Sequence, residues 1–206
     1  MSTAIVPSGD NEPAAPLSGG MKALTIWQPW ASLIAEGAKT IETRSWSAPA
    51  SLIGQRIAIH AAKHHPYRDL DHLPGDVENG YEWRWLGDWR IAWDYEDRTL
   101  RLDLWNEQTE QEVDAPFGAV VATAVLADCL PIIGPGDEID LSRPYIAESG
   151  DRLYEWLEDE PQINITDQAP YGDFTPGRWG WVLEEVHGLP EPIPAKGRQG
   201  VWRWQP

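Results

Sequence analysis

Four closely spaced residues, Gly37, Lys39, Glu42 and Arg44, give this sequence its clearest capacity for chemistry. Arg44 offers a planar fork of donors for a phosphate or a nucleobase edge, and Lys39 offers a mobile point charge. Glu42 offers an acceptor for an exocyclic amine or a ring N–H. Charged groups of both signs beside aromatic rings usually face a cleft, because burying them without partners is unfavourable. The pattern therefore predicts a polar ligand-binding cleft.

Two tryptophans flank these charges and extend the same hypothesis. Trp30 and Trp46 are candidates for stacking on a base, which contributes about 1–3 kcal/mol per base in single-strand binding systems. The alternative is that Glu42 and Arg44, two residues apart on one strand face, form an ordinary surface ion pair worth about 0–1 kcal/mol. The residues alone leave both interpretations open.

His60 and Lys63 follow the neighbouring predicted strand and are candidates to close the cleft from its other side. His60 alternates with alanines, so a hydrogen-bonded core histidine is an equally good interpretation. His64 and His65 lack a second cluster at zinc spacing, so we expect no metal site. The single cysteine, Cys129, has no partner for a disulfide and is expected to be a structural thiol at a buried strand end.

The elements that would position these residues are mostly strands. One short helix is expected over residues 30–36, because Gly37 is typical of the position just after a helix. Alternation over residues 40–46 predicts a strand with Glu42, Arg44 and Trp46 on one face. Apolar alternation and β-branched runs predict further strands at 21–26, 54–62, 117–126, 178–186 and 200–204.

The charge is unevenly distributed along the 206 residues, whose net charge is −17. Residues 21–63 carry five basic and two acidic side chains, residues 64–115 carry five and fourteen, and residues 137–173 carry two and eleven. A strongly acidic chain argues against a nucleic-acid partner, because phosphate binding depends on Lys and Arg. Since the acidity sits in two segments, the remaining body is still expected to present a locally positive cleft.

The chain is long enough for one domain with a proper core and does not require two. Residues 1–20 are rich in Pro, Gly, Ser and Ala and are expected to be a disordered tail, with a single domain over 21–206. The acidic segments, at about 64–115 and 137–173, are expected to be partly helical insertions, the clearer helix running from Tyr145 to Glu158. Four tryptophans of the first segment are expected to pack locally: Trp83, Trp85, Trp89 and Trp93.

Two runs near the start, residues 26–34 and 37–46, resemble the opening of ASCH domains, named for homology to activating signal cointegrator. Residues 60–63, 118–123, 181–184 and 197–202 are similar to later pieces of that family. The resemblance implies an α+β fold, a PUA-like β-barrel with an early short helix flanking the barrel, and a cleft between the two. It also brings Ser32 into the set of candidate ligand-binding residues.

The resemblance leaves binding and catalysis both open. Small bacterial ASCH proteins that deacetylate acetylcytidine use the lysine matching Lys39 and a threonine three residues later, where this chain has Glu42. A carboxylate cannot replace that hydroxyl nucleophile, although Glu42 with Lys39 is a candidate pair for activating water. Longer eukaryotic-type ASCH domains, similar in residues 28–32 and in this glutamate, are associated with nucleic-acid binding. The leading hypothesis is a binder of RNA or a modified nucleobase, nucleoside or nucleotide.

Other partners follow from the same observations. Duplex DNA is a further candidate ligand, and a hydrolase of modified nucleosides or of RNA is the first alternative function. A module that docks a basic protein partner through its acidic insertions is the second alternative. No cofactor motif or phosphate loop occurs in the sequence, so no cofactor is expected. The absence of a long apolar run and of a signal-peptide pattern predicts a cytoplasmic protein without membrane contact.

Overall fold

The computed structural model describes residues 20–64, 75–78, 81–93, 102–134, 146–147 and 167–206. The predicted tail and the predicted helix from Tyr145 to Glu158 lie outside these residues, apart from Gly20 and the pair Ile146–Ala147, which forms a short strand. The described chain is mostly β and contains one α-helix and two 3-10 turns. The α+β expectation thus overstated its helical content.

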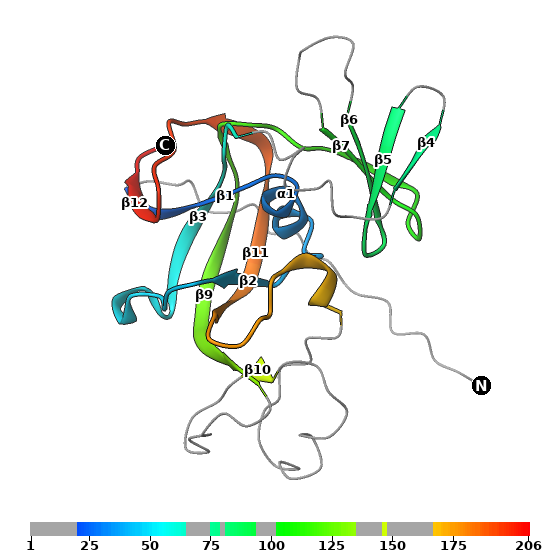
Figure 1. Ribbon diagram of the computed structural model, residues 1–206. Helices are drawn as coiled ribbons and strands as arrows, with labels where there is room; N and C mark the ends of the chain where they lie inside the picture. The colour runs from blue at the N-terminus through cyan, green and yellow to red at the C-terminus, as the bar shows by residue number, and fades with distance from the viewer. Residues whose placement is uncertain (1–19, 65–74, 79–80, 94–101, 135–145, 148–166) are drawn as a thin grey trace, which may run out of the picture.

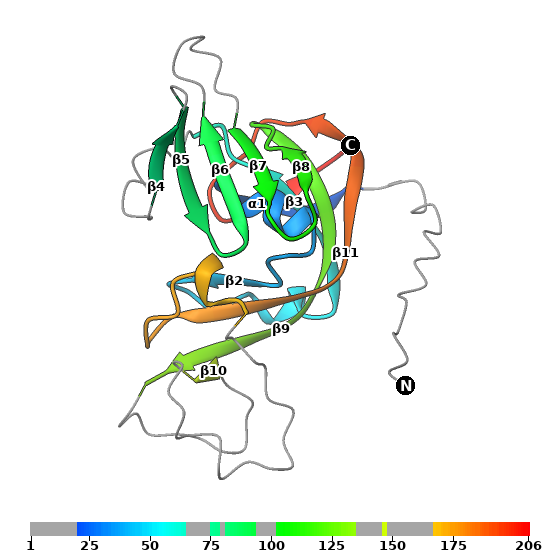
Figure 2. The same ribbon diagram turned by 90° about the vertical axis from the view of Figure 1, so that its right-hand side faces the viewer.

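The larger sheet curls into a half-barrel that is consistent with a PUA-like fold (Figures 1 and 2). Its strands run in the order β12-β1-β3-β9-β11-β2, with β10 added beside β9. Most pairs are antiparallel, whereas β1 runs parallel to β3 and β10 parallel to β9. The bounds are β1 Met21–Ile26, β2 Ile41–Arg44, β3 Gln55–Ala61, β9 Ala119–Ile133, β10 Ile146–Ala147, β11 Trp179–Pro194 and β12 Val201–Trp204. All six predicted strands of the barrel are confirmed.

Two strands extend well past their predicted ends because they bend around the barrel. β9 and β11 pair along most of their length, and their register shifts three times, as bulged and strongly curved strands do. As a result Cys129 lies inside β9 and is half-buried, not at a buried strand end. Its Sγ accepts a hydrogen bond from the Ala48 N–H at 3.1 Å, and burial raises the pKa of its thiol.

The helix α1, Trp30–Ala35, packs across the concave side of the half-barrel (Figure 2). Ala31 and Ile34 join the main core with residues of β1, β3, β9 and β11, while Leu33 belongs to a second cluster. Gly37 follows at φ +76°, a conformation that glycine adopts without strain, and the chain then turns back towards β2. The predicted helix and its glycine end are confirmed.

The described part of the first acidic segment forms a second sheet. Its five antiparallel strands follow one another in chain order beside α1 (Figure 1). They are β4 Gly75–Glu78, β5 Tyr81–Leu86, β6 Trp89–Trp93, β7 Leu102–Asn106 and β8 Gln111–Asp114. Leu86, Trp89, Ile91 and Leu104 are buried in one cluster with Leu33 of α1, which ties this sheet to the helix. Where the segment is described, strands are found in place of the expected helix, because alternation at a spacing of two, visible in β5, is the period of a strand.

Candidate functional site

Lys39 is held at the bottom of a cleft, with its side chain 1 % exposed. Its Nζ donates to the carbonyl oxygens of Ile41 at 2.7 Å and Tyr171 at 2.6 Å, and it lies 3.3 Å from Oε2 of Glu42. An ammonium has three protons, so these three partners occupy all of them. Burial lowers the pKa of Lys39, and the neighbouring Glu42 opposes that shift. The Lys39 ammonium is therefore held in place by these three partners, and the expectation of a mobile charge was wrong.

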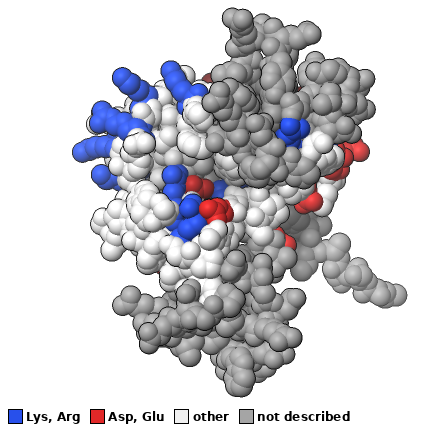
Figure 3. Space-filling view, viewed as in Figure 1, with Lys and Arg blue, Asp and Glu red and all other residues white. Residues whose placement is uncertain are grey.

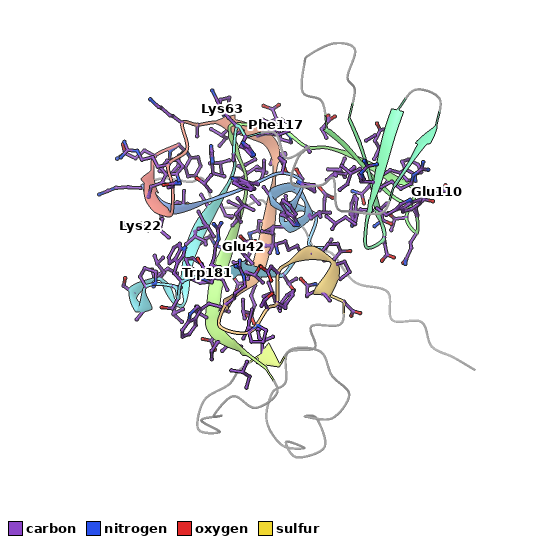
Figure 4. The ribbon with its side chains drawn as sticks, viewed as in Figure 1. Lys22, Glu42, Lys63, Glu110, Phe117 and Trp181 are labelled. Carbon is purple, nitrogen blue, oxygen red and sulfur yellow. The ribbon has the colours of Figure 1, made fainter. Side chains whose placement is uncertain are left out.

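Glu42 lies between two cations on the face of β2 that turns toward the cleft (Figure 4). Its Oε2 faces Lys39, and its Oε1 forms an ion pair with Nε of Arg44 at 2.9 Å. The predicted alternation holds for Glu42 and Arg44 against Ile41, which packs into an apolar cluster with Leu130 and Ile132. It does not hold for Thr43, which lines the cleft as well. Only a tenth of the Glu42 side chain is exposed, so the alternative of an ordinary surface ion pair does not describe this site.

Arg44 spans the edge of the cleft and retains free donor capacity. Its Nη2 donates to the Thr25 carbonyl at 2.8 Å, which fixes the plane of the guanidinium. Among the described residues, none bonds to Nη1, and about a quarter of the side chain is exposed. Arg44 can therefore present N–H groups to a ligand while staying bound to Glu42.

The wall opposite β2 comes from residues 167–178, which span the end of the second acidic segment and the residues just after it. Gln168 is buried and binds the turn before β2, accepting from the N–H groups of Thr40 and Ile41 and donating to the Ala38 carbonyl. The Asp173 N–H donates to Oγ1 of Thr43 at 3.0 Å. Together with the Lys39–Tyr171 bond, these contacts attach the wall firmly to the floor of the cleft.

The carboxylate of Asp173 is itself fixed. It accepts hydrogen bonds from the backbone and side chain of Thr175 and lies 3.3 Å from Nη1 of Arg178. The Thr175 hydrogen bond, supported by Arg178, holds the pKa of Asp173 below its ordinary value. Asp173 is therefore ionised at neutral pH, and its charge is balanced by Arg178.

The cleft between these walls has a volume of about 450 Å³, which lies in the range of small-ligand sites. Figure 3 shows it as a central hollow in which basic and acidic side chains meet. Trp27 stands at its edge, 45 % exposed, with its ring centroid 4.8 Å from that of His64. The lining consists of Thr25, Ile26, Trp27, Trp30, Lys39, Glu42, Thr43, Arg44, Leu86, Pro170, Tyr171, Gly172, Asp173 and Arg178. We call this space the base cleft.

A second hollow of about 820 Å³ adjoins the base cleft and shares Thr25, Trp27 and Arg44 with it. Its other lining residues come from the end of β3, the start of β9 and the connection between β11 and β12: His60, Ala62, Lys63, Gly118, Pro194, Ala195, Lys196, Gly197, Arg198, Gln199 and Gly200. We call this space the basic groove.

His60 forms part of the floor of the basic groove, and its side chain is almost wholly buried. Its Nε2 lies 3.1 Å from the Ala195 carbonyl oxygen, and its ring meets Trp202 edge to face. Burial lowers the pKa of His60, so the ring is neutral at pH 7. This arrangement matches the interpretation of a hydrogen-bonded core histidine.

The predicted site residues thus fall into three groups. Trp30, Lys39, Glu42 and Arg44 meet in the base cleft, while His60 and Lys63 meet Arg44 in the basic groove. Three others line neither space: Ser32, Gly37 and Trp46.

Each residue of that third group has a structural explanation. Ser32 is buried at the start of α1, where its hydroxyl accepts a hydrogen bond from the Gln28 amide. Gly37 ends the helix. Trp46 packs edge to face on Trp181, because the chain leaves β2 after Arg44 and the strand alternation does not reach it.

Several lining residues were missed from the sequence. Trp27 precedes the helix, and the sequence pattern favours Trp30 and Trp46 as the stacking residues. Tyr171, Asp173 and Arg178 lie in or after the segment interpreted as an insertion, and their only signal was a cluster of Pro, Gly and aromatic residues just before β11. Contacts across 130 residues, such as that between Thr43 and Asp173, leave no periodic trace in a sequence.

The described residues contain no group of three or more His, Cys, Asp or Glu side chains arranged to hold a metal ion. No helix in the described part of the chain has the length and apolar character needed to cross a membrane.

Comparison with known proteins gives one finding. The family model described as ASCH domain matches residues 24–156, a range that includes α1, β2 and the whole of the second sheet. It therefore covers Lys39, Glu42 and Arg44 but not the opposite wall at 167–178. A search of curated proteins found no match to this sequence.

Proposed function

Because this chain belongs to the ASCH domain family, whose members are generally RNA-binding domains of PUA-like fold, we propose that its base cleft binds a single nucleobase of RNA, including a modified base. The proposal goes beyond the family in naming the residues and the part of the ligand they contact. It rests on the arrangement of Glu42 and Arg44, a fixed acceptor beside a fixed donor in a half-enclosed space.

The pairing of acceptor and donor matches the edge of a base. A nucleobase presents an amino or ring N–H group next to a ring nitrogen or carbonyl oxygen, so it can donate to Glu42 while accepting from Nη1 of Arg44. Both protein groups are already oriented by other contacts, which reduces the entropy lost on binding. A base held in this way needs a flat apolar neighbour, and Trp27 and Trp30 line the same space.

Lys39 is a positioning residue, which acts on the ligand only through Glu42. Its ion pair holds Oε2 of Glu42, and its two bonds to carbonyl oxygens keep the ammonium from turning toward the ligand. The triad of Lys39, Glu42 and Arg44 contains two positive charges and one negative charge. A carboxylate acceptor is thereby presented to an anionic polymer without net negative charge at the contact.

The geometry favours binding over hydrolysis. For Lys39 to act as a general base it must first lose a proton, but deprotonated Lys39 would leave the buried Ile41 and Tyr171 carbonyl groups with fewer donors. Glu42 is held between Lys39 and Arg44, and each of its two oxygens already contacts one of these cations. Incubation with a panel of modified nucleosides, analysed by mass spectrometry, is expected to show no change in mass. A change that is abolished in Glu42→Gln would reverse this preference.

The decisive binding experiment substitutes Glu42→Gln and compares it with Glu185→Gln. Glu185 is a carboxylate paired with Arg56 on the barrel and lines neither space. Both substitutions remove one negative charge, which alone would tighten RNA binding slightly. Loss of a base-reading acceptor in Glu42→Gln is instead expected to weaken binding by roughly 1–3 kcal/mol, on the order of tenfold to a hundredfold.

Binding is measured by fluorescence anisotropy of a labelled mixed-sequence single-stranded RNA at about 50 and 200 mM salt, with free nucleosides as competitors. Urea unfolding confirms that each variant is folded, and Arg44→Gln serves as a second variant if Glu42→Gln is unstable. Equal effects of Glu42→Gln and Glu185→Gln would show that the cleft does not read a base. Failure of the wild type to bind either RNA or free nucleosides would remove the proposed function altogether.

A further inference from the structure

The basic groove has the charge of a phosphate-binding surface. Its lining contains Arg44, Lys63, Lys196 and Arg198 and no Asp or Glu, although the whole chain is strongly acidic. Figure 3 shows Lys and Arg side chains gathered on the side of the molecule that holds β12 and the preceding connection. Lys63, Lys196 and Arg198 are exposed, and none of the three forms an ion pair with a described residue. Their charges are available to a ligand.

The groove is held in shape by the barrel. The connection between β11 and β12 is fixed at its start, where the Ala195 N–H donates to the Gly118 carbonyl at 2.9 Å and the Ala195 carbonyl contacts His60. Nearer its end, the Arg198 carbonyl accepts a hydrogen bond from the Thr25 hydroxyl at 2.8 Å. The backbone that carries Lys196 and Arg198 is thus anchored just before Lys196 and at Arg198 itself.

The groove is continuous with the base cleft. Thr25, Trp27 and Arg44 line both spaces, so a long enough ligand in one can reach the other without leaving the protein surface. The chemistry changes along that path. The base cleft combines an acceptor, donors and aromatic rings, whereas the groove offers cations and backbone.

We propose that the basic groove holds backbone phosphates of an RNA single strand whose base occupies the base cleft, so the ligand is a polynucleotide and not a free nucleoside. This inference rests on the proposed function. Bases and phosphates alternate along a single strand. The base cleft suits a base, and the adjoining basic groove suits phosphates. Trp27, at their junction, stands where the strand passes from one to the other.

The test removes the two cations of the β11–β12 connection in Lys196→Gln/Arg198→Gln. The matched control is Lys22→Gln/Arg203→Gln, because these residues are exposed, pair across β1 and β12, and line neither space. Both double variants change the net charge equally. Binding of the labelled RNA is measured from about 50 to 400 mM salt, and the affinity of free nucleosides is measured by competition.

We expect the groove variant to bind RNA on the order of tenfold or more weakly at low salt. Its plot of log affinity against log salt should be shallower by about 1.4, since each phosphate contact on a single strand contributes about 0.7 to the slope. The control variant should match the wild type, and nucleoside affinity should be the same in all three proteins.

The possible failures are separable. Equal RNA binding by the groove and control variants would overturn the phosphate groove while leaving the base cleft in place. Binding of free nucleosides without binding of RNA would also overturn it, because the ligand would then end at the base. Absence of both activities in the wild type would instead reject the proposed function, and this inference with it.

Discussion

Replacing Lys39 with methionine should destabilise the protein far more than its single charge suggests. The substitution keeps the length of the side chain but leaves the Ile41 and Tyr171 carbonyl groups without their Nζ donor, and each unsatisfied buried group costs about 1–3 kcal/mol. It also leaves Glu42 with one counter-ion in place of two, and breaking a buried ion pair costs about 3–5 kcal/mol. These losses overlap because they share one ammonium, so we expect a total of about 3–5 kcal/mol.

The free energy of unfolding is measured by urea titration, with tryptophan fluorescence as the signal. Lys22→Met is the control, since Lys22 is exposed on β1, and it should stay within about 0.5 kcal/mol of the wild type. In a chain of this length the Lys39→Met loss corresponds to a fall of roughly 6–20 °C in Tm. The double substitution Lys39→Met/Glu42→Gln should recover part of the loss by removing the underpaired carboxylate. If the free energy of unfolding of Lys39→Met lay within about 1 kcal/mol of the wild-type value, the stabilising role of the buried Lys39 contacts would be refuted.

Three further predictions follow from single contacts. Trp27→Ala should weaken RNA binding by about 1–3 kcal/mol in the anisotropy assay, whereas Trp46→Ala, outside both spaces, should leave it unchanged. Gly197→Ala should displace the β11–β12 connection and weaken RNA binding, because the added Cβ would clash with the His60 ring; an unchanged affinity would contradict that packing. Cys129 should react with iodoacetamide at pH 8 more slowly in the folded protein than in urea, as followed by mass spectrometry, because burial raises the pKa of its thiol.

The local features of the base cleft were predictable, and its long-range contacts were not. The apolar pattern and Gly37 predicted α1, and alternation placed Glu42 and Arg44 on one face of β2. Both depend on residues within a few positions of each other. The burial of the Lys39 ammonium depends on its bond to Tyr171, which is 132 residues away. The sequence could therefore show the charge of Lys39 but not its burial. A lysine within a polar stretch of sequence is predicted to be exposed, and only the structure shows the carbonyl groups that bind it.

The acidic segments show a second limit of sequence patterns. Composition identified residues 64–115 as different from the barrel, but high acidity favours neither helix nor strand. The apolar side chains of β6 and β7 decide the outcome, because they form one buried cluster with Leu33 and so attach the segment to α1. The suggestion that the acidic segments dock a basic protein partner stays a prediction, which deletion of residues 66–114 and a capture assay would test.

The charge balance of the base cleft links its stability to its proposed function. An anionic strand would be repelled by Glu42 alone, and Arg44 alone would attract phosphates without distinguishing one base edge from another. Lys39 lies buried under the cleft and balances the charge of Glu42 without competing for the ligand. Nη1 of Arg44 therefore stays available to the ligand. The same ammonium also bonds the opposite wall through Tyr171, so the group that balances Glu42 helps to hold the cleft in shape. A variant that loses Lys39 should therefore lose base recognition and stability together, whereas one that loses only the basic groove should keep both.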